Sequence, residues 1–204
     1  NDGSTANDVY CTVAGDDAND GLSPATPKAT VQAILAAYDL QPGDTVLVDT
    51  GVYTLTNGLA LTDAADGGSA QGYVTIQGSP HPQGTEFRRA TSNGATVQLD
   101  ADYLRLKDLR VTGGRDGIYI PNHSYRYEIA DCAIYGNEWA INSAQPYPNW
   151  DTPSLWIHGC TIYSNTAGGI QIRTRSNYST VEGCSFYGNG GTAIYGARIL
   201  RETI

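Results

Sequence analysis

The stretch that decides the fold is CTIYSNTAGGIQI, residues 160–172, because other parts of the chain repeat its pattern. CAIYGNEWAIN begins at Cys132, and CSFYGNGGTAIY begins at Cys184. The three cysteines are separated by 28 and 24 residues, and a weaker copy, LRVTGGRDGIYI, begins at Leu109. Self-similarity at a period of twenty-odd residues is typical of repeat proteins, in which each unit buries its apolar face against its neighbours.

Aligned copies carry similar residues at equivalent positions. The aligned columns are Leu106, Ile129, Ile157 and Val181; Leu109, Cys132, Cys160 and Cys184; Val111, Ile134, Ile162 and Phe186; Gly114, Asn137, Asn165 and Asn189; and Ile118, Ile141, Ile170 and Ile194. Apolar and polar residues alternate with a period of two, which predicts short strands rather than helices. Gly or Asp falls at the bends, where a left-handed backbone is tolerated; these positions are Asp108, Asp131, Gly159 and Gly183.

Short strands, tight bends and columns of like residues predict an all-β fold, a single-stranded parallel β-helix whose coils stack about 4.8 Å apart. In this solenoid the asparagine column would form hydrogen bonds from coil to coil and satisfy backbone groups in the turns. A leucine-rich horseshoe would need a regular leucine pattern with a helix in each unit. A β-sandwich would show hairpin turns without matching columns, so the β-helix is the better interpretation.

The segment before the repeats predicts a capping α-helix. Thr26-Pro27 or Thr30 can start the helix, and Pro42-Gly43 ends it. The apolar stripe at helical spacing is Val31, Ile34, Leu35 and Tyr38. Such a helix would cover the strand edges at the open end of the solenoid. We therefore expect one domain, 1–204, with a cap at 1–43 and stacked coils at 44–204.

Two parts of the chain resemble the right-handed parallel β-helix proteins of the pectate-lyase-like superfamily. One is the repeat seen as IHGCTIYSN and VEGCSFYGN, and the other is the N-terminal stretch from Val13 to Tyr53. The resemblance implies a secreted or cell-surface protein directed at carbohydrate, most plausibly a polysaccharide lyase acting on an acidic polysaccharide. The superfamily also includes hydrolases, epimerases, adhesins and structural proteins. The alternative is therefore a non-catalytic extracellular module that binds glycans, such as cell-surface glycans, or forms fibres.

Composition excludes several classes of partner. The net charge is −9, and no run of basic residues is present, so nucleic acid and anionic membranes are poor partners. The longest apolar run is far too short to span a bilayer, so we expect no membrane insertion. The four cysteines are Cys11, Cys132, Cys160 and Cys184. Stacked side chains are poorly placed to pair, so we expect buried free thiols rather than disulfides.

Lyase chemistry requires a base and a group that neutralises the uronate carboxylate, which is either Arg or Ca²⁺. Lys107 is a candidate base, and Arg173 and Arg175 alternate on one strand and could grip a carboxylate. Asp108 and Asp131 are stacked and could share a calcium ion. The same residues are also explained as turn and surface residues. The cluster of Asp ligands that accompanies the lysine base in lyases of this superfamily is not found.

Other candidate residues would contact the substrate. Tyr147 and Trp150 lie in the longest interruption, SAQPYPNWDTPS, and could stack on sugar rings or fold back onto the coil wall. His158 shares an outward column with Lys107. The hydrolase signatures of the superfamily are absent. The acidic loop GDDANDG does not have the spacing of an EF-hand, so we interpret it as a turn-forming loop rather than a metal site.

The end of the sequence, GARILRETI, follows closely on a repeat. Three interpretations remain open. The chain is a piece of a longer protein, or its last coil is covered by Ile199, Leu200 and Ile204, or its open end stacks on another molecule in end-to-end self-association.

Overall fold

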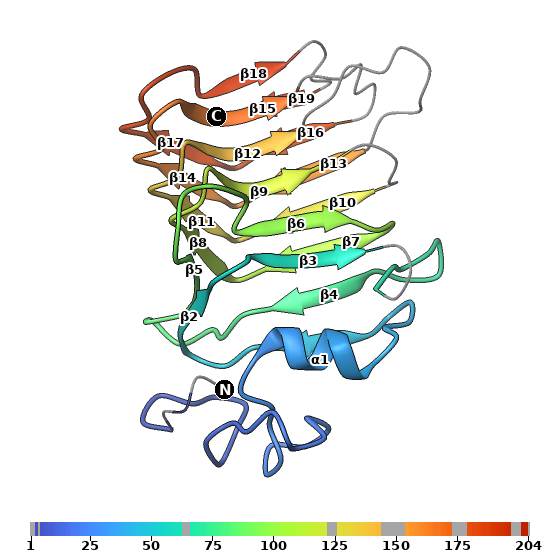
Figure 1. Ribbon diagram of the computed structural model, residues 1–204. Coiled ribbons are helices and arrows are strands. Elements are labelled where there is room, and N and C mark those ends of the chain that lie inside the picture. Colours follow the sequence, from blue (N-terminus) through green and yellow to red (C-terminus); the bar gives the residue numbers. More distant parts are fainter. Residues whose placement is uncertain are drawn as a thin grey trace.

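The computed structural model is a solenoid of three parallel sheets that run along one axis (Figure 1). It describes residues 3, 5–62, 66–121, 126–143, 154–172, 179–196 and 201–203. Strands β1 to β18 form successive triplets, one triplet a coil, and each coil gives one strand to each sheet. The predicted all-β parallel β-helix is therefore confirmed.

We name the sheets A, B and C in the order in which the chain visits them. Sheet A contains β1 (Thr45–Leu47), β4 (Val74–Gln77), β7 (Leu104–Lys107), β10 (Tyr127–Ala130), β13 (Leu155–His158), β16 (Thr180–Glu182) and β19 (Arg201–Thr203). Sheet B contains β2 (Gly51–Leu55), β5 (Thr85–Arg89), β8 (Leu109–Thr112), β11 (Ala133–Tyr135), β14 (Thr161–Tyr163) and β17 (Ser185–Tyr187). Sheet C contains β3 (Leu59–Thr62), β6 (Val97–Asp100), β9 (Asp116–Ile120), β12 (Trp139–Ser143), β15 (Gly168–Ile172) and β18 (Ile194–Gly196).

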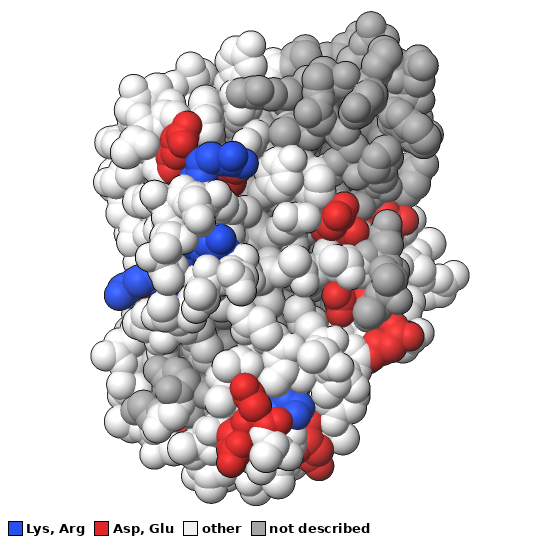
Figure 2. All heavy atoms as spheres, viewed as in Figure 1, with Lys and Arg blue, Asp and Glu red and all other residues white. Residues whose placement is uncertain are grey.

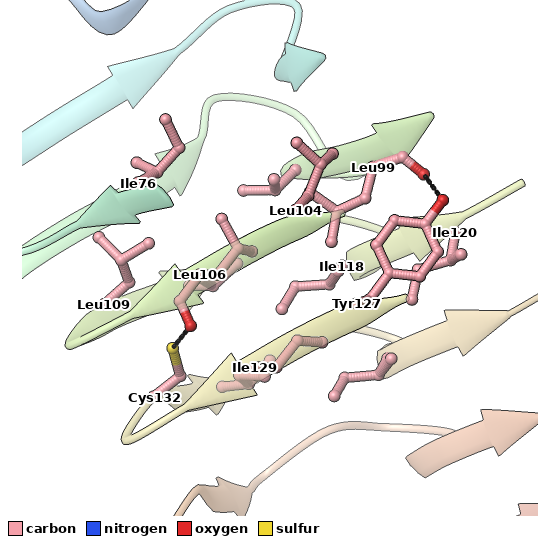
Figure 3. Close-up of a cluster of buried hydrophobic side chains, with 14 of the residues drawn as sticks. Ile76, Leu99, Leu104, Leu106, Leu109, Ile118, Ile120, Tyr127, Ile129 and Cys132 are labelled. Carbon is pink, nitrogen blue, oxygen red and sulfur yellow. Dashed lines mark hydrogen bonds between the residues drawn. The ribbon is translucent and has the colours of Figure 1, made fainter. Parts of the chain in front are cut away.

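The apolar columns are aligned as the repeats predict. Ile129 is in register with Leu106 below it and with Ile157 above it, and Val181 continues the column. These side chains point inward and are almost fully buried. Figure 3 shows how the side chains from neighbouring coils pack on one another, and how the Tyr127 hydroxyl donates to the carbonyl of Leu99 at 3.2 Å. The core is thus a continuous stack of aliphatic layers.

The asparagine column forms the predicted ladder. The Oδ1 atom of Asn165 accepts hydrogen bonds from the backbone N and the Nδ2 of Asn137, both at 3.1 Å. Asn189 accepts in the same way from Asn165, at 3.1 and 3.0 Å. At the lower end, the Gly114 N–H donates to Asn137 Oδ1 at 3.0 Å, and the ladder stops there because glycine has no side-chain amide.

Predicted bend residues occupy the left-handed region of backbone space. Asp108 and Asp131 have φ of 54° and 53°, and Gly159 and Gly183 have φ of 64° and 60°. Each stands between a strand of sheet A and the next strand of sheet B. A single left-handed residue turns the chain sharply there, so the side chains of Asp108 and Asp131 lie at the edge of sheet A.

The capping helix α1 spans Val31–Ala37 and lies across the end of the solenoid where β1 begins (Figure 1). Of the two predicted starts, Thr30 is correct: its side chain accepts a hydrogen bond from the Ala33 N–H. The helix is shorter than predicted, because Tyr38 is already extended, with φ −132° and ψ 138°. No helix within the described ranges is long and apolar enough to cross a membrane.

The four cysteines are free thiols, as expected. Cys132, Cys160 and Cys184 are buried, and each Sγ lies within 3.2 to 3.4 Å of the backbone carbonyl two residues before it. Hydrogen bonding within the thiol stack and burial raise the pKa of Cys160 and of Cys184. Cys11 is partly exposed, and burial raises its pKa to about 11.

We expect only Cys11 to react when the native protein is treated with a thiol reagent at neutral pH. The reaction should be slow, because the raised pKa of Cys11 leaves little thiolate. All four thiols should react in denaturant, and Cys11→Ser should leave none reactive in the native state. Rapid labelling of Cys132, Cys160 or Cys184 in the native protein would contradict the buried stack.

Candidate functional site

The outer face of sheet A carries two columns of outward side chains, which we call the sheet A face. One column contains Thr75, Arg105, Glu128, Trp156 and Thr180. The other contains Gln77, Lys107, Ala130, His158 and Glu182. The alternation in LRLK, YEIA and LWIH places every second residue of these strands outward. The two columns together present charged and aromatic groups side by side.

Glu128 lies at the centre of this face. Its Oε2 accepts from Arg105 Nε at 2.8 Å and lies 2.7 Å from Arg105 Nη2. Its Oε1 lies 3.2 Å from His158 Nε2. The side chain of Glu128 is only 8% exposed, so its charge is compensated by neighbours rather than by water. Three residues from three successive coils are thereby held in one arrangement.

Trp156 provides an aromatic surface beside this cluster. Its ring stacks on His158 with centroids 4.2 Å apart and planes 29° apart. Its Nε1 donates to Glu182 Oε1 at 2.8 Å, which fixes the indole orientation. Trp156 is nevertheless 43% exposed. A large aromatic side chain held in place and open to solvent is a suitable surface for a sugar ring.

Two tyrosines continue the face toward the cap. The guanidinium of Arg105 lies 4.7 Å from the ring centroid of Tyr73, a cation–π contact. The rings of Tyr73 and Tyr103 meet edge to face at 6.0 Å. Burial and the nearby charge of Glu128 raise the pKa of Tyr73, so this hydroxyl stays protonated and able to donate. Polar and aromatic groups thus extend over several coils.

Lys107 and the two stacked aspartates lie at the edge of the same face. Lys107 Nζ is 3.8 Å from Asp108 Oδ2, a long ion pair between partly exposed groups that adds little stability. Burial raises the pKa of Asp108, and the charge of Asp131 adds to this, whereas Lys107 opposes it. The Asp131 carboxylate reaches to the bend of the next coil. A Cβ added to Gly159 would stand 2.3 Å from Asp131 Oδ1.

The carboxylates do not form a full metal site by themselves. Among the residues that the structure describes, no group of three or more His, Cys, Asp or Glu is placed to hold a metal ion. Calcium takes six to eight oxygen ligands. Asp108 and Asp131 therefore fit as part of a ligand set, which a substrate carboxylate and water would have to complete. The calcium expectation stays a prediction.

Four of the predicted site residues are brought to one face, and four cannot be placed. Lys107, His158, Asp108 and Asp131 all lie on the sheet A face or its edge. The other four, Arg173, Arg175, Tyr147 and Trp150, lie outside the described residues. In the acidic loop GDDANDG, Asp17 accepts hydrogen bonds from Thr30, and Asp20 accepts from Leu22 and Thr26, as a turn-forming loop requires.

Sequence reasoning missed the centre of the cluster. Arg105, Glu128 and Trp156 stand two residues before Lys107, Ala130 and His158, in the second outward column. The period-two alternation already places them on the same face. The missing information was which side chains on that face contact one another, and this depends on rotamers rather than on register.

Comparison with solved structures finds the same architecture in two polysaccharide lyases. The crystal structure of the pectate lyase Pel9A matches with a TM-score of 0.62 and 17% identity, covering 86% of this chain and 52% of that one. The alginate lyase from Paenibacillus sp. strain FPU-7 matches with a TM-score of 0.61 and 18% identity, covering 80% of this chain and 62% of that one. The chain thus spans between half and two thirds of the length of these enzymes, and at this identity the likeness shows the fold.

A search of curated proteins finds no relative by sequence. The family model described as right-handed β-helix region matches residues 91–200, which is more than half of the chain. This span covers β6 to β18, in which the asparagine ladder and the cysteine stack lie. The chain therefore belongs to the right-handed β-helix family.

Proposed function

We propose that this chain acts on an acidic polysaccharide at the sheet A face, as a polysaccharide lyase-like enzyme. The observation that carries the proposal is the arrangement of Trp156, His158, Glu128 and Arg105 beside Lys107. An aromatic surface and cationic groups on one rigid sheet suit a polymer of uronate sugars. The names of the two similar structures support this choice, since pectate and alginate are both polyuronates.

In β-elimination a base removes the proton next to the uronate carboxylate, and the bond to the leaving sugar oxygen breaks. Lys107 is the candidate base, and it can accept a proton only after its ammonium group has lost one. Its Nζ lies 3.8 Å from Asp108 Oδ2, with a side chain 40% exposed. Arg105, with a side chain 34% exposed, can contact a substrate carboxylate while it remains bound to Glu128. Arg173 and Arg175 are proposed as further carboxylate contacts, and Tyr147 and Trp150 as sugar contacts.

We propose Asp108 and Asp131 as the calcium ligands of this chain. On the described part of the sheet A face and its edge, the carboxylates Asp108, Glu128, Asp131 and Glu182 outnumber the bases Arg105, Lys107 and Arg126. A polyanion would be repelled there unless a cation lay between. The ion would supply that charge compensation for the substrate carboxylate, and Asp108 bound to it would no longer hold Lys107.

The test is an assay on pectate, alginate and glycosaminoglycans, with and without Ca²⁺, following the ultraviolet absorbance of unsaturated chain ends. We expect a calcium-dependent rise with one polymer. Lys107→Ala should lower the rate at least 100-fold, since general-base catalysis contributes about 10²–10⁴-fold. The matched control is Lys28→Ala, because Lys28 in the cap is the other lysine of the chain. A rate unchanged in Lys107→Ala would remove Lys107 from the mechanism.

A second candidate function is a non-catalytic module that binds glycans or forms fibres. The observation that favours it is the engagement of both oxygens of Glu128 and of the Lys107 ammonium by neighbours. The outer face of sheet B adds a stack of Tyr135, Tyr163 and Tyr187, with centroids 4.8 and 5.0 Å apart, that serves packing between coils. This function would be favoured if a polymer in a gel retards the protein while the ultraviolet absorbance of unsaturated chain ends does not rise.

Location and assembly follow from the same proposal. Acidic polysaccharides of this kind lie outside the cell, so we propose that the protein is secreted or held at the cell surface. End-to-end self-association stays a prediction. Tyr187 on β17 and Tyr195 on β18 are 55% and 57% exposed near the end of the described coils, and sedimentation at rising protein concentration would test whether the rods stack.

A further inference from the structure

The outer face of sheet C carries a second group of aromatic and amide side chains, away from the sheet A face. One outward column contains Gln98, Tyr119, Asn142, Gln171 and Tyr195. A neighbouring column contains Asp116, Trp139 and Gly168. Figure 2 looks at the side of the molecule where the sheet C strands lie in front, and much of the surface there is uncharged.

Trp139 packs against the next coil. A Cβ on Gly168 would stand 2.5 Å from Cζ3 and 3.1 Å from Cη2 of Trp139, so the six-membered ring occupies the space that a side chain would need. Gly168 is the register partner of Trp139 one coil further on. Trp139 itself is half-buried, so part of the indole stays open to solvent. An aromatic side chain that is partly open to solvent and packed in place can stack on a sugar ring.

Two amide oxygens on this face have no hydrogen-bond partner among the residues that the structure describes. Asn142 Nδ2 donates to Asp116 Oδ1 at 2.8 Å, which leaves Asn142 Oδ1 as an unused acceptor. Gln171 is 5% exposed, and its Oε1 is likewise a buried acceptor without a partner. The two residues are register partners on adjacent strands. Unsatisfied buried acceptors are rare and costly, so a pair of them would be stabilised by a donor that the described part of the chain does not supply.

The charges around this group are already compensated. Asp116 is fully buried, and Arg115 donates to its Oδ2 through Nε at 3.0 Å and Nη2 at 2.9 Å. The remaining charged groups in Figure 2 include acidic residues gathered beyond the ends of the sheet C strands. Figure 2 also shows Lys and Arg groups on the opposite side of the same view, so this face has no single sign of charge. The groups on this face that remain available to a ligand are therefore two hydrogen-bond acceptors and an aromatic ring. Acceptors suit the hydroxyl donors of an uncharged ligand, and the aromatic ring suits stacking on a sugar.

We propose that the outer face of sheet C binds an uncharged, hydroxyl-rich saccharide. The sugar ring stacks on Trp139, and hydroxyl groups of the sugar donate to Asn142 Oδ1 and Gln171 Oε1. Both oxygens are shielded in the free chain, so binding requires a neighbouring side chain to move. Tyr195, the register partner of Gln171 one coil further on, is 57% exposed. This site is independent of the acidic-polysaccharide site on sheet A.

The experiment is affinity gel electrophoresis in gels containing hydroxyethyl cellulose, xylan, galactomannan or laminarin, with polygalacturonate as the acidic contrast. We expect at least one neutral polymer to retard the protein. Trp139→Ala should weaken that retardation at least 10-fold. Trp156→Ala is the matched control, because it removes an aromatic surface of the same kind from sheet A, and it should bind the neutral polymer as the unmodified protein does.

A second variant separates binding from folding. Gln171→Met keeps the approximate volume and removes the unsatisfied acceptor, so its stability should equal or exceed that of the unmodified protein. Its binding of the neutral polymer should fall as in Trp139→Ala. The proposal is overturned if no neutral polymer retards the protein, or if Trp139→Ala and Gln171→Met bind normally. Neither result bears on cleavage of acidic polymers, so the two proposals fail separately.

Discussion

Replacement of Asn165 by leucine is expected to destabilise the fold by about 3–5 kcal/mol. Asn165 is fully buried. Its Nδ2 donates to the carbonyls of Ile134 and Tyr163, both at 3.1 Å, and its Oδ1 accepts from Asn137. Leucine fills the space but satisfies none of these groups, and each unsatisfied buried group costs about 1–3 kcal/mol. Denaturant unfolding followed by circular dichroism measures the loss.

The matched control is the same replacement at Asn189, nearer the end of the ladder. Asn189 is less buried, and the described chain provides no further asparagine above it. Asn189→Leu should therefore cost less than Asn165→Leu. Neither variant should change glycan binding selectively, because the ladder is internal. Normal unfolding of Asn165→Leu would mean that the ladder does not hold the coils together.

Asp49→Asn is expected to cost about 3 kcal/mol at neutral pH, because Asp49 binds the N-terminal segment to the first coil. The fully buried carboxylate accepts from the backbone N–H groups of Val9, Tyr10, Cys11 and Thr50 at 2.7 to 2.8 Å. The asparagine amide offers one acceptor oxygen and turns an NH₂ group toward these donors. Urea unfolding of the two proteins at neutral pH measures the difference.

The pH dependence of stability gives an independent check on Asp49. Burial opposes its ionisation, but the four backbone donors outweigh burial and lower its pKa. Asp49 therefore stabilises the fold fully above its unfolded-state pKa of about 3.9. This contribution is lost as the pH falls from there through the lower folded-state pKa. The Asp49→Asn penalty should shrink in that window. A penalty of equal size at all pH values would contradict the role of the charge.

The sequence is highly informative about the coils, because like residues stack directly on one another. Ile129, Ile157 and Val181 are neighbours in the structure because a parallel β-helix repeats the same position once a coil. The bends at Asp108 and Asp131 were predictable because few residues tolerate a left-handed backbone. The end of α1 at Ala37 was not predictable, since the residues from Tyr38 to Leu40 have no local signal that breaks a helix.

The candidate site was only partly predictable. Register places Lys107 and His158 in one outward column, and this follows from the repeat alone. The Glu128 contacts with Arg105 and His158 depend on how long side chains reach across coils, and the repeat does not constrain their rotamers. Trp139 was missed for a related reason: its position over Gly168 becomes visible only when the two coils are superposed.

The measurement that tests the central claim most directly is retardation by acidic polymers in a gel, compared among the unmodified protein, Trp156→Ala and Trp139→Ala. The central claim is that the sheet A face binds the acidic polysaccharide. It predicts that polygalacturonate or alginate retards the unmodified protein and Trp139→Ala equally, and that Trp156→Ala loses most of this retardation while its unfolding stays normal. Undiminished retardation of Trp156→Ala would contradict the claim and place the acidic-polymer site elsewhere on the molecule.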